Sequence, residues 1–129
     1  MSQEKVIQIS QLELRHLRNL PWFTARGMRG DYLLFNVGTL EPGKWGGWHK
    51  HEGNEEIYYV MKGSGKFMWE EDGKILEKEI KEGDMVYQPE GLWNQTVGGK
   101  EPLVIVFAVA PVSKLLKSTQ ESETHKKTK

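Results

Sequence analysis

Residues 43–63 of this chain read GKWGGWHKHEGNEEIYYVMKG. One residue separates His49 from His51, and side chains two positions apart on a β-strand point to the same side. Glu56 follows after four further residues, so the next strand can return its carboxylate to that side. Two imidazoles and one carboxylate on a common side are three ligands for one divalent cation. The stretch therefore predicts a metal-binding β-hairpin.

The sequence around this stretch predicts an all-β fold. From Tyr32 to Ala110, short apolar or β-branched runs alternate with glycine and proline about every ten residues, and no long helical pattern interrupts them. Asp72-Gly73 is typical of a two-residue type I′ hairpin turn, because both residues tolerate positive φ. This rhythm indicates a sandwich or closed barrel. The expected strands are 32–40, 46–51, 55–61, 65–71, 74–80, 84–88, 93–97 and 103–109.

The two ends of the chain differ from this middle part. Val6 to Ile9 alternates as a strand does, and an unpaired edge strand would be a liability. We therefore expect residues 1–31 to form an N-terminal extension that pairs with the barrel or with a second subunit. Residues 32–111 are expected to form the barrel. Residues 112–129 are rich in Ser, Thr, Lys and Glu, which predicts a solvated, mobile tail.

Composition excludes several classes of partner and site. Lys plus Arg and Asp plus Glu both number 18, so no bulk positive field favours nucleic acid. No apolar run approaches the roughly 20 residues that span a bilayer, and the first residues lack the pattern of a signal peptide. We therefore expect a soluble, cytoplasmic protein without nucleic-acid or membrane partners. The chain has no cysteine, so any metal must be held by nitrogen and oxygen.

A second motif accompanies the first. Five residues separate Gly83 from Pro89, one separates Pro89 from Gly91, and two separate Gly91 from Asn94. Together with the spacing within residues 43–63, this pattern resembles the two motifs of the cupin superfamily. The resemblance covers about residues 32–110 and implies a jelly-roll β-barrel, also called a double-stranded β-helix. Such stand-alone domains are commonly homodimers.

The resemblance implies a site whose metal ligands are His49, His51 and Glu56. Glu55 competes with Glu56, but the six residues between Glu56 and Gly63 are the count that the family shows. The family usually carries a third histidine where this chain has Asn94, whose neutral amide oxygen is a poor ligand. Asn94 can complete the site, hydrogen-bond a metal-bound water or the substrate, or merely fill the space.

Tyr58 shares the side of Glu56 and is expected to face the same interior. It is either a hydrogen-bond donor to a ligand, which makes it a candidate catalytic residue, or a core side chain whose hydroxyl has found a partner. Trp45, Trp48 and Trp93 lie next to the site residues in sequence. They can stack on a sugar or aromatic ring, although packing and subunit contact are the more common uses.

The sequence thus predicts a small cupin holding a divalent metal ion, with Fe, Mn, Ni and Zn as candidates, that acts on a small polar organic substrate. Two histidines and one carboxylate leave coordination positions open, as in non-haem iron oxygenases. The fold alone does not choose between dioxygenase, lyase and isomerase chemistry. The alternative is a non-catalytic ligand-binding cupin with a degenerate metal site, which the missing third histidine favours.

Overall fold

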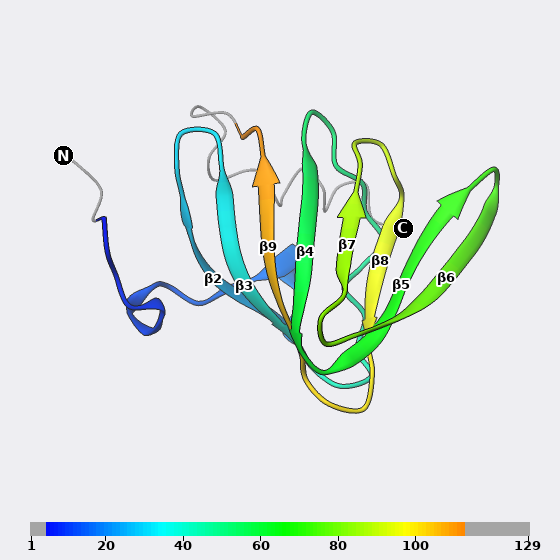
Figure 1. Cartoon of the computed structure of the whole chain (residues 1–129), viewed down its shortest axis with the longest axis horizontal. Coiled ribbons are helices and arrows are strands. Elements are labelled where there is room, and N and C mark those ends of the chain that lie inside the picture. Colours follow the sequence, from blue (N-terminus) through cyan, green and yellow to red (C-terminus); the bar gives the residue numbers. More distant parts are fainter. Residues whose placement is uncertain (1–4, 113–129) are drawn as a thin grey trace.

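The computed structural model describes residues 5–112, whose strands form two antiparallel sheets (Figure 1). One sheet has the order β1-β2-β3-β9-β4-β7, and the other has the order β6-β5-β8. Two short 3-10 helices, η1 and η2, precede β2. The all-β prediction is confirmed. The elements are η1 (Ile9–Gln11), β1 (Arg15–His16), η2 (Leu17–Asn19), β2 (Phe23–Arg29), β3 (Leu34–Leu40), β4 (Glu55–Lys62), β5 (Ser64–Glu71), β6 (Lys74–Lys81), β7 (Met85–Gln88), β8 (Asn94–Gly98) and β9 (Leu103–Ala110).

Strict alternation along β4 positions the site. Glu56, Tyr58 and Val60 are buried, whereas Glu55 and Ile57 are exposed. Because successive side chains of a strand point to opposite faces, one face of β4 lines the barrel interior and the other faces outward. The same alternation along β9 places Leu103, Ile105, Phe107 and Val109 in the core. The core consists of Leu17, Phe23, Ala25, Leu34, Leu40, Tyr58, Val60, Phe67, Ile80, Val86, Leu103, Ile105, Phe107, Val109 and Val112.

The β5–β6 hairpin extends away from the rest of the barrel (Figure 1). Asp72 and Gly73 form its turn with φ values of 51° and 77°, so both adopt the positive φ that the sequence predicts. β6 is the last strand of its sheet, and β7 is the last strand of the other. Two strand edges therefore border the seam between the sheets on this side.

Two predictions about secondary structure were wrong. Residues 46–51 do not form a continuous strand, because only two isolated bridges, Trp45 to Val97 and His49 to Asn94, join this segment to the sheet. Gly47, with a φ of 93°, breaks the extended backbone between them. The segment from Val6 to Ile9 is not a strand either, and the chain enters η1 at Ile9.

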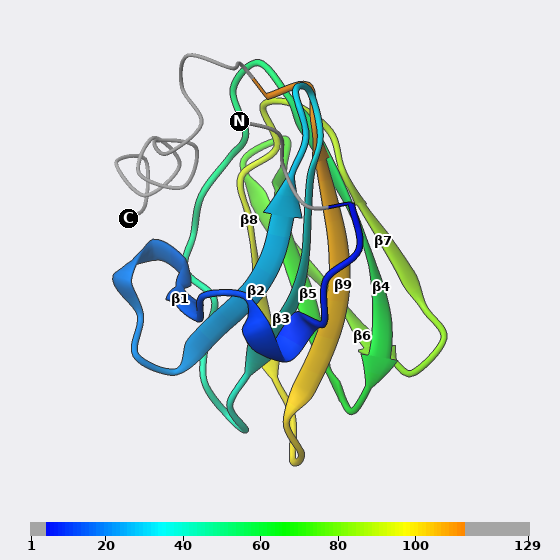
Figure 2. The same cartoon turned by 90° about the vertical axis from the view of Figure 1, so that its left-hand side faces the viewer.

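β1 and β2, which precede the expected barrel, nevertheless belong to the larger sheet. β2 pairs along its whole length with β3, and β1 adds two residues at the outer edge of β2. Both 3-10 helices lie against β2 (Figure 2). The expected mobile tail falls almost entirely on residues 113–129, outside the described part of the chain. Among the described residues, no helix has the length and apolar character to cross a membrane.

Candidate functional site

The two histidines sit on the irregular segment that borders β8. The backbone N–H of His49 donates to the Asn94 carbonyl at 3.0 Å, and the Asn94 N–H donates back to the His49 carbonyl at 2.9 Å. The His51 carbonyl accepts a 2.8 Å hydrogen bond from the Gly91 N–H. The turn that carries the second motif thus fixes the backbone of the first, and both histidines are buried.

His51 and Glu56 are in direct contact inside the barrel. His51 Nε2 lies 2.9 Å from Glu56 Oε1, and the two residues are only 4% and 8% exposed. An ionised carboxylate only accepts hydrogen bonds, so Nε2 carries the proton in this contact and Nδ1 keeps a lone pair. That Nδ1 atom is buried and has no hydrogen-bond partner among the described residues. A buried lone pair without a hydrogen-bond partner is chemistry that a cation satisfies.

His49 is held by its own backbone neighbour. Its Nδ1 donates to the Gly47 carbonyl at 2.8 Å, which leaves Nε2 as the atom able to bind a metal. Burial lowers the pKa of the His49 imidazole well below its ordinary value of 6.5, and electrostatic repulsion, first from Arg18 and then from His51, lowers it further. The hydrogen bond to Gly47 opposes this shift. His49 is therefore neutral, as a ligating imidazole must be.

The three candidate ligands are neighbours, but they are not arranged as a complete metal site. The His49 and His51 rings are 5.4 Å apart between centroids and nearly perpendicular at 86°. Across residues 5–112, no group of three or more His, Cys, Asp or Glu side chains is arranged to hold a metal ion as it stands. The donor types nevertheless fit a divalent first-row metal, since both imidazoles have a lone pair and Glu56 supplies an anionic oxygen.

Asn94 is buried beside these residues, but its amide nitrogen is engaged elsewhere. Nδ2 donates to the Leu92 carbonyl at 2.9 Å and lies 3.5 Å from the His49 carbonyl. The side chain therefore ties the β8 end to the histidine segment. Only the amide oxygen of Asn94 has the lone pairs to coordinate a cation.

The structure distinguishes the other candidates by orientation. Glu55 faces outward and accepts a 2.7 Å hydrogen bond from the Tyr87 hydroxyl, so Glu56 is the inward carboxylate. Tyr58 is 1% exposed, and its hydroxyl shares a 2.7 Å hydrogen bond with Thr96 Oγ1. Burial raises the pKa of the Tyr58 hydroxyl far above its usual value, so the hydroxyl stays protonated.

Two polar residues near the site, one buried and one half-buried, were not among the candidates. Gln88 is 2% exposed and pairs in register with Glu56, which alternation along residues 84–88 could have indicated. Arg18 donates from Nε to the Gly46 carbonyl at 2.7 Å. No sequence pattern could have indicated Arg18, because it is far from the histidines in sequence and only the fold brings η2 close to the histidine segment.

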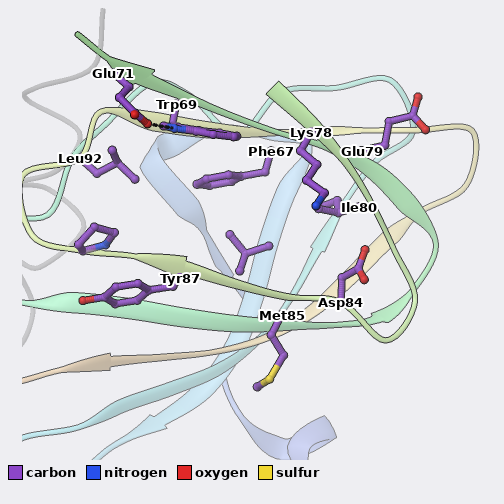
Figure 3. A pocket seen from close by; sticks show the side chains of 12 residues that line it. Phe67, Trp69, Glu71, Lys78, Glu79, Ile80, Asp84, Met85, Tyr87 and Leu92 are labelled. Carbon is purple, nitrogen blue, oxygen red and sulfur yellow. Dashed lines mark hydrogen bonds between the residues drawn. The ribbon is translucent and has the colours of Figure 1, made fainter. Parts of the chain in front are cut away.

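Two cavities of the structure are lined by none of the candidate ligands His49, His51, Glu56 and Asn94. Trp48 and Trp93 line a small cavity of about 110 Å³ with Glu70 and Ile75, and Trp45 packs edge-on against Trp22. A larger cavity of about 460 Å³ opens along the seam between β6 and β7, as Figure 3 shows. Its lining comprises Phe67, Trp69, Glu71, Lys78, Glu79, Ile80, Asp84, Met85, Val86, Tyr87, Pro89 and Leu92.

The two antiparallel sheets face each other and enclose a buried polar cluster of histidine and glutamate side chains. The protein is therefore a β-barrel with an internal site. The cupin domain model matches residues 36–109, and the chain belongs to the cupin family. This confirms the resemblance seen in the two sequence motifs.

One curated relative and several similar solved structures are proteins named for oxalate. The chain is 36% identical over 81 residues to the oxalate-binding protein of Thermotoga maritima, which covers 63% of this chain and 60% of that protein. The structure matches oxalate decarboxylase of Bacillus subtilis with a TM-score of 0.71 and 20% identity over 81% of this chain and 29% of that one. Oxalate decarboxylase of Lactobacillus farciminis matches with a TM-score of 0.70 and 14% identity over 81% and 32%. The chain thus spans about 60% of the curated relative and about a third of the decarboxylases, whose similarity shows the jelly-roll fold.

Proposed function

We propose that this protein binds a divalent metal ion through His49, His51 and Glu56 and acts there on a small polar organic molecule that carries a carboxylate. The observation that carries the proposal is the buried contact between His51 and Glu56, together with the unpartnered second nitrogen, Nδ1, of the same imidazole. A bound metal would polarise a coordinated oxygen as a Lewis acid or, if it is iron, activate dioxygen.

The hydrogen bonds and charge states of the residues around the site support this proposal. The Gly47 carbonyl orients the His49 ring, and burial keeps that imidazole neutral. The hydroxyl groups of Tyr58 and Thr96 hydrogen-bond to each other, so these residues form an uncharged part of the barrel wall. The three side-chain ligands leave coordination positions for a ligand and for water.

The names of the relatives support a particular ligand class. One relative is named for binding oxalate, and the similar structures are decarboxylases named for oxalate. One of the similar structures is of the Bacillus subtilis enzyme with Mn(II) centres. We therefore propose oxalate, or a similarly small carboxylate, as the first ligand to test and Mn(II) as the first metal.

A non-catalytic binding protein is the second candidate. It is favoured by Asn94, whose amide nitrogen is engaged by backbone carbonyls at the position where the family usually has a third histidine. A site with three protein ligands and one weak amide oxygen would hold its metal less tightly than a four-ligand site.

The decisive experiment compares neighbouring carboxylates. Metal content would be measured after gentle purification, and binding of Mn(II), Fe(II), Ni(II) and Zn(II) by calorimetry. Glu56→Gln should lose metal affinity by at least about tenfold, whereas Glu55→Gln, the matched outward control, should bind as the native protein does. Equal affinities in the two variants, or no metal binding by the native protein, would refute the proposal. Consumption of oxalate by the metal-loaded protein would then separate an enzyme from a binding protein.

We also propose that a second copy of the chain covers the outer face of the larger sheet. Tyr59 pairs with Val106 and Met85, and Ile57 pairs with Ala108, so apolar side chains adjoin across β9, β4 and β7. The six exposed apolar side chains of this face offer roughly 600 Å² at about half exposure, close to the ~800 Å² that each partner contributes to a standard interface. They are Phe35, Ile57, Tyr59, Met61, Met85 and Tyr87.

The oligomeric state tests this proposal directly. Light scattering during gel filtration should give a dimer for the native protein and for Leu76→Glu, a control on β6 in the other sheet. Tyr59→Glu places a charge at the centre of the face and should give a monomer. A monomeric native protein would refute the proposed interface.

A further inference from the structure

The larger cavity, between β6 and β7, has the size and the walls of a small-molecule site. Its volume of about 460 Å³ lies within the roughly 300–1,000 Å³ of typical ligand pockets. Phe67 and Trp69 on β5 form one wall, with ring centroids 5.7 Å apart and an angle of only 22° between the ring planes. Val86, on β7 of the opposite sheet, lines the same cavity. A flat aromatic surface opposite an aliphatic side chain can accept a planar ring between them.

Neighbouring side chains hold this aromatic wall in place. Phe67 is 7% exposed, and its ring packs edge-on against the Tyr58 ring at 6.4 Å between centroids. Trp69 donates from Nε1 to Glu71 Oε1 at 3.0 Å. The wall is thus ordered before any ligand arrives, which lowers the entropic cost of binding.

Two of the four charged residues that line the cavity are engaged or directed away from it. Glu71 accepts the hydrogen bond from Trp69. Glu79 precedes the buried Ile80 on β6, so its side chain lies on the outward face of the strand, and Figure 3 shows it pointing away from the cavity. The two that remain are Lys78 and Asp84, one of each sign.

Lys78 and Asp84 lie at the same end of the cavity (Figure 3). Lys78 pairs in register with Phe67, so its side chain is on the cavity face of β6. No hydrogen bond or ion pair joins Lys78 to another residue within 5–112. Asp84 Oδ2 accepts the Lys81 backbone N–H at 2.9 Å, which orients the carboxylate and leaves Oδ1 for a donor. One cation and one carboxylate therefore stand beside the aromatic wall.

We propose that this cavity binds an aromatic α-amino acid. The ring lies against Phe67 and Trp69, the ligand carboxylate accepts from the Lys78 ammonium, and the ligand ammonium donates to Asp84. A ligand with a single charge would pair with one of these two side chains and meet a like charge on the other, whereas a zwitterion pairs with both. None of the candidate metal ligands lines the cavity, so this inference is independent of the proposed function.

Calorimetric titration of phenylalanine into the native protein, with a chelator present, tests this assignment. Three further probes each lack one recognised group: 3-phenylpropionate lacks the ammonium, phenethylamine lacks the carboxylate, and alanine lacks the ring. Each should bind at least about fivefold more weakly than phenylalanine. Because these probes are compared on the unaltered protein, the comparison does not depend on whether a variant folds.

Variants then assign the contacts to residues. Lys78→Gln, Asp84→Asn and Trp69→Leu should each weaken phenylalanine binding by at least about fivefold, and Asp84→Asn keeps an oxygen for the Lys81 N–H. Lys81→Gln and Glu79→Gln remove the same charges from the outward face of β6 and should bind phenylalanine as the native protein does. Melting temperatures without ligand check that each variant is folded.

Three results would overturn the inference. They are no binding of phenylalanine by the native protein, equal affinities for phenylalanine and either singly charged probe, and losses in the outward controls equal to those in Lys78→Gln and Asp84→Asn. Mn(II) affinity, measured in parallel without chelator, should stay native in Lys78→Gln and Asp84→Asn. Failure of the amino-acid site would therefore leave the proposed metal site standing.

Discussion

The buried, neutral state of His49 makes the stability of the metal-free protein depend on pH. The pKa of this imidazole is well below 6.5 in the folded chain and returns to about 6.5 when the chain unfolds. Between these two values the unfolded chain binds one more proton than the folded chain. The free energy of unfolding therefore falls as the pH falls below 6.5, and it does not change through His49 at higher pH.

The size of the effect follows from a single proton. One group contributes up to about 1.4 kcal/mol per pH unit, so lowering the pH from 7.0 to 5.0 should cost about 2 kcal/mol if the folded pKa lies below that range. Urea unfolding at a series of pH values, in the presence of a chelator, measures this slope. His49→Asn keeps a nitrogen donor for the Gly47 carbonyl but removes the titrating group.

The comparison of the two proteins isolates His49 from the other titrating residues. The native protein should lose about 2 kcal/mol more than His49→Asn between pH 7.0 and 5.0, and the two curves should run parallel at higher pH. Identical slopes at all pH values would show that His49 titrates normally in the folded chain. The argument for a buried, neutral imidazole would then fail.

Two further predictions concern the barrel wall. Tyr58→Phe leaves the Thr96 hydroxyl without its partner and should destabilise the protein by about 1–2 kcal/mol in urea unfolding, and adding Thr96→Val should recover part of this loss. Additive losses in the double variant would contradict the pairing. A Cβ on Gly27 would meet the Asn36 side chain, so Gly27→Ala should cost about 1–3 kcal/mol or more, whereas Gly30→Ala, with its nearest neighbour at 3.7 Å, should cost far less. Similar melting temperatures for the two glycine variants would rule out the clash.

The arrangement of the candidate site followed largely from local spacing. Alternation placed Tyr58 on the side of Glu56, and the six-residue interval to Gly63 chose Glu56 over Glu55. The burial of Glu56 and the exposure of Glu55 agree with that choice. Side chains alternate between the two faces of any β-strand, so this part of the site can be predicted from the sequence alone.

Features that depend on contacts between distant segments could not be predicted in this way. β2 was missed because its inward residues include Ala25 and Gly27, which give no apolar alternation. Gly27 is small because the side chain of Asn36 occupies the space beside it. The expected strand over 46–51 failed because Gly46 and Gly47 lie against Phe23 and Arg18, residues far away in sequence.

The exposed edge of β6 has a consequence for the solubility of the protein. A strand with one free edge can recruit a strand from another molecule and so begin aggregation. Five of the eight residues of β6 are charged and alternate in sign along the strand: Lys74, Glu77, Lys78, Glu79 and Lys81. Any incoming strand would have to bury these charges beside its own backbone. The same residues that leave the β5–β6 hairpin extended in water thus protect it from forming intermolecular sheets.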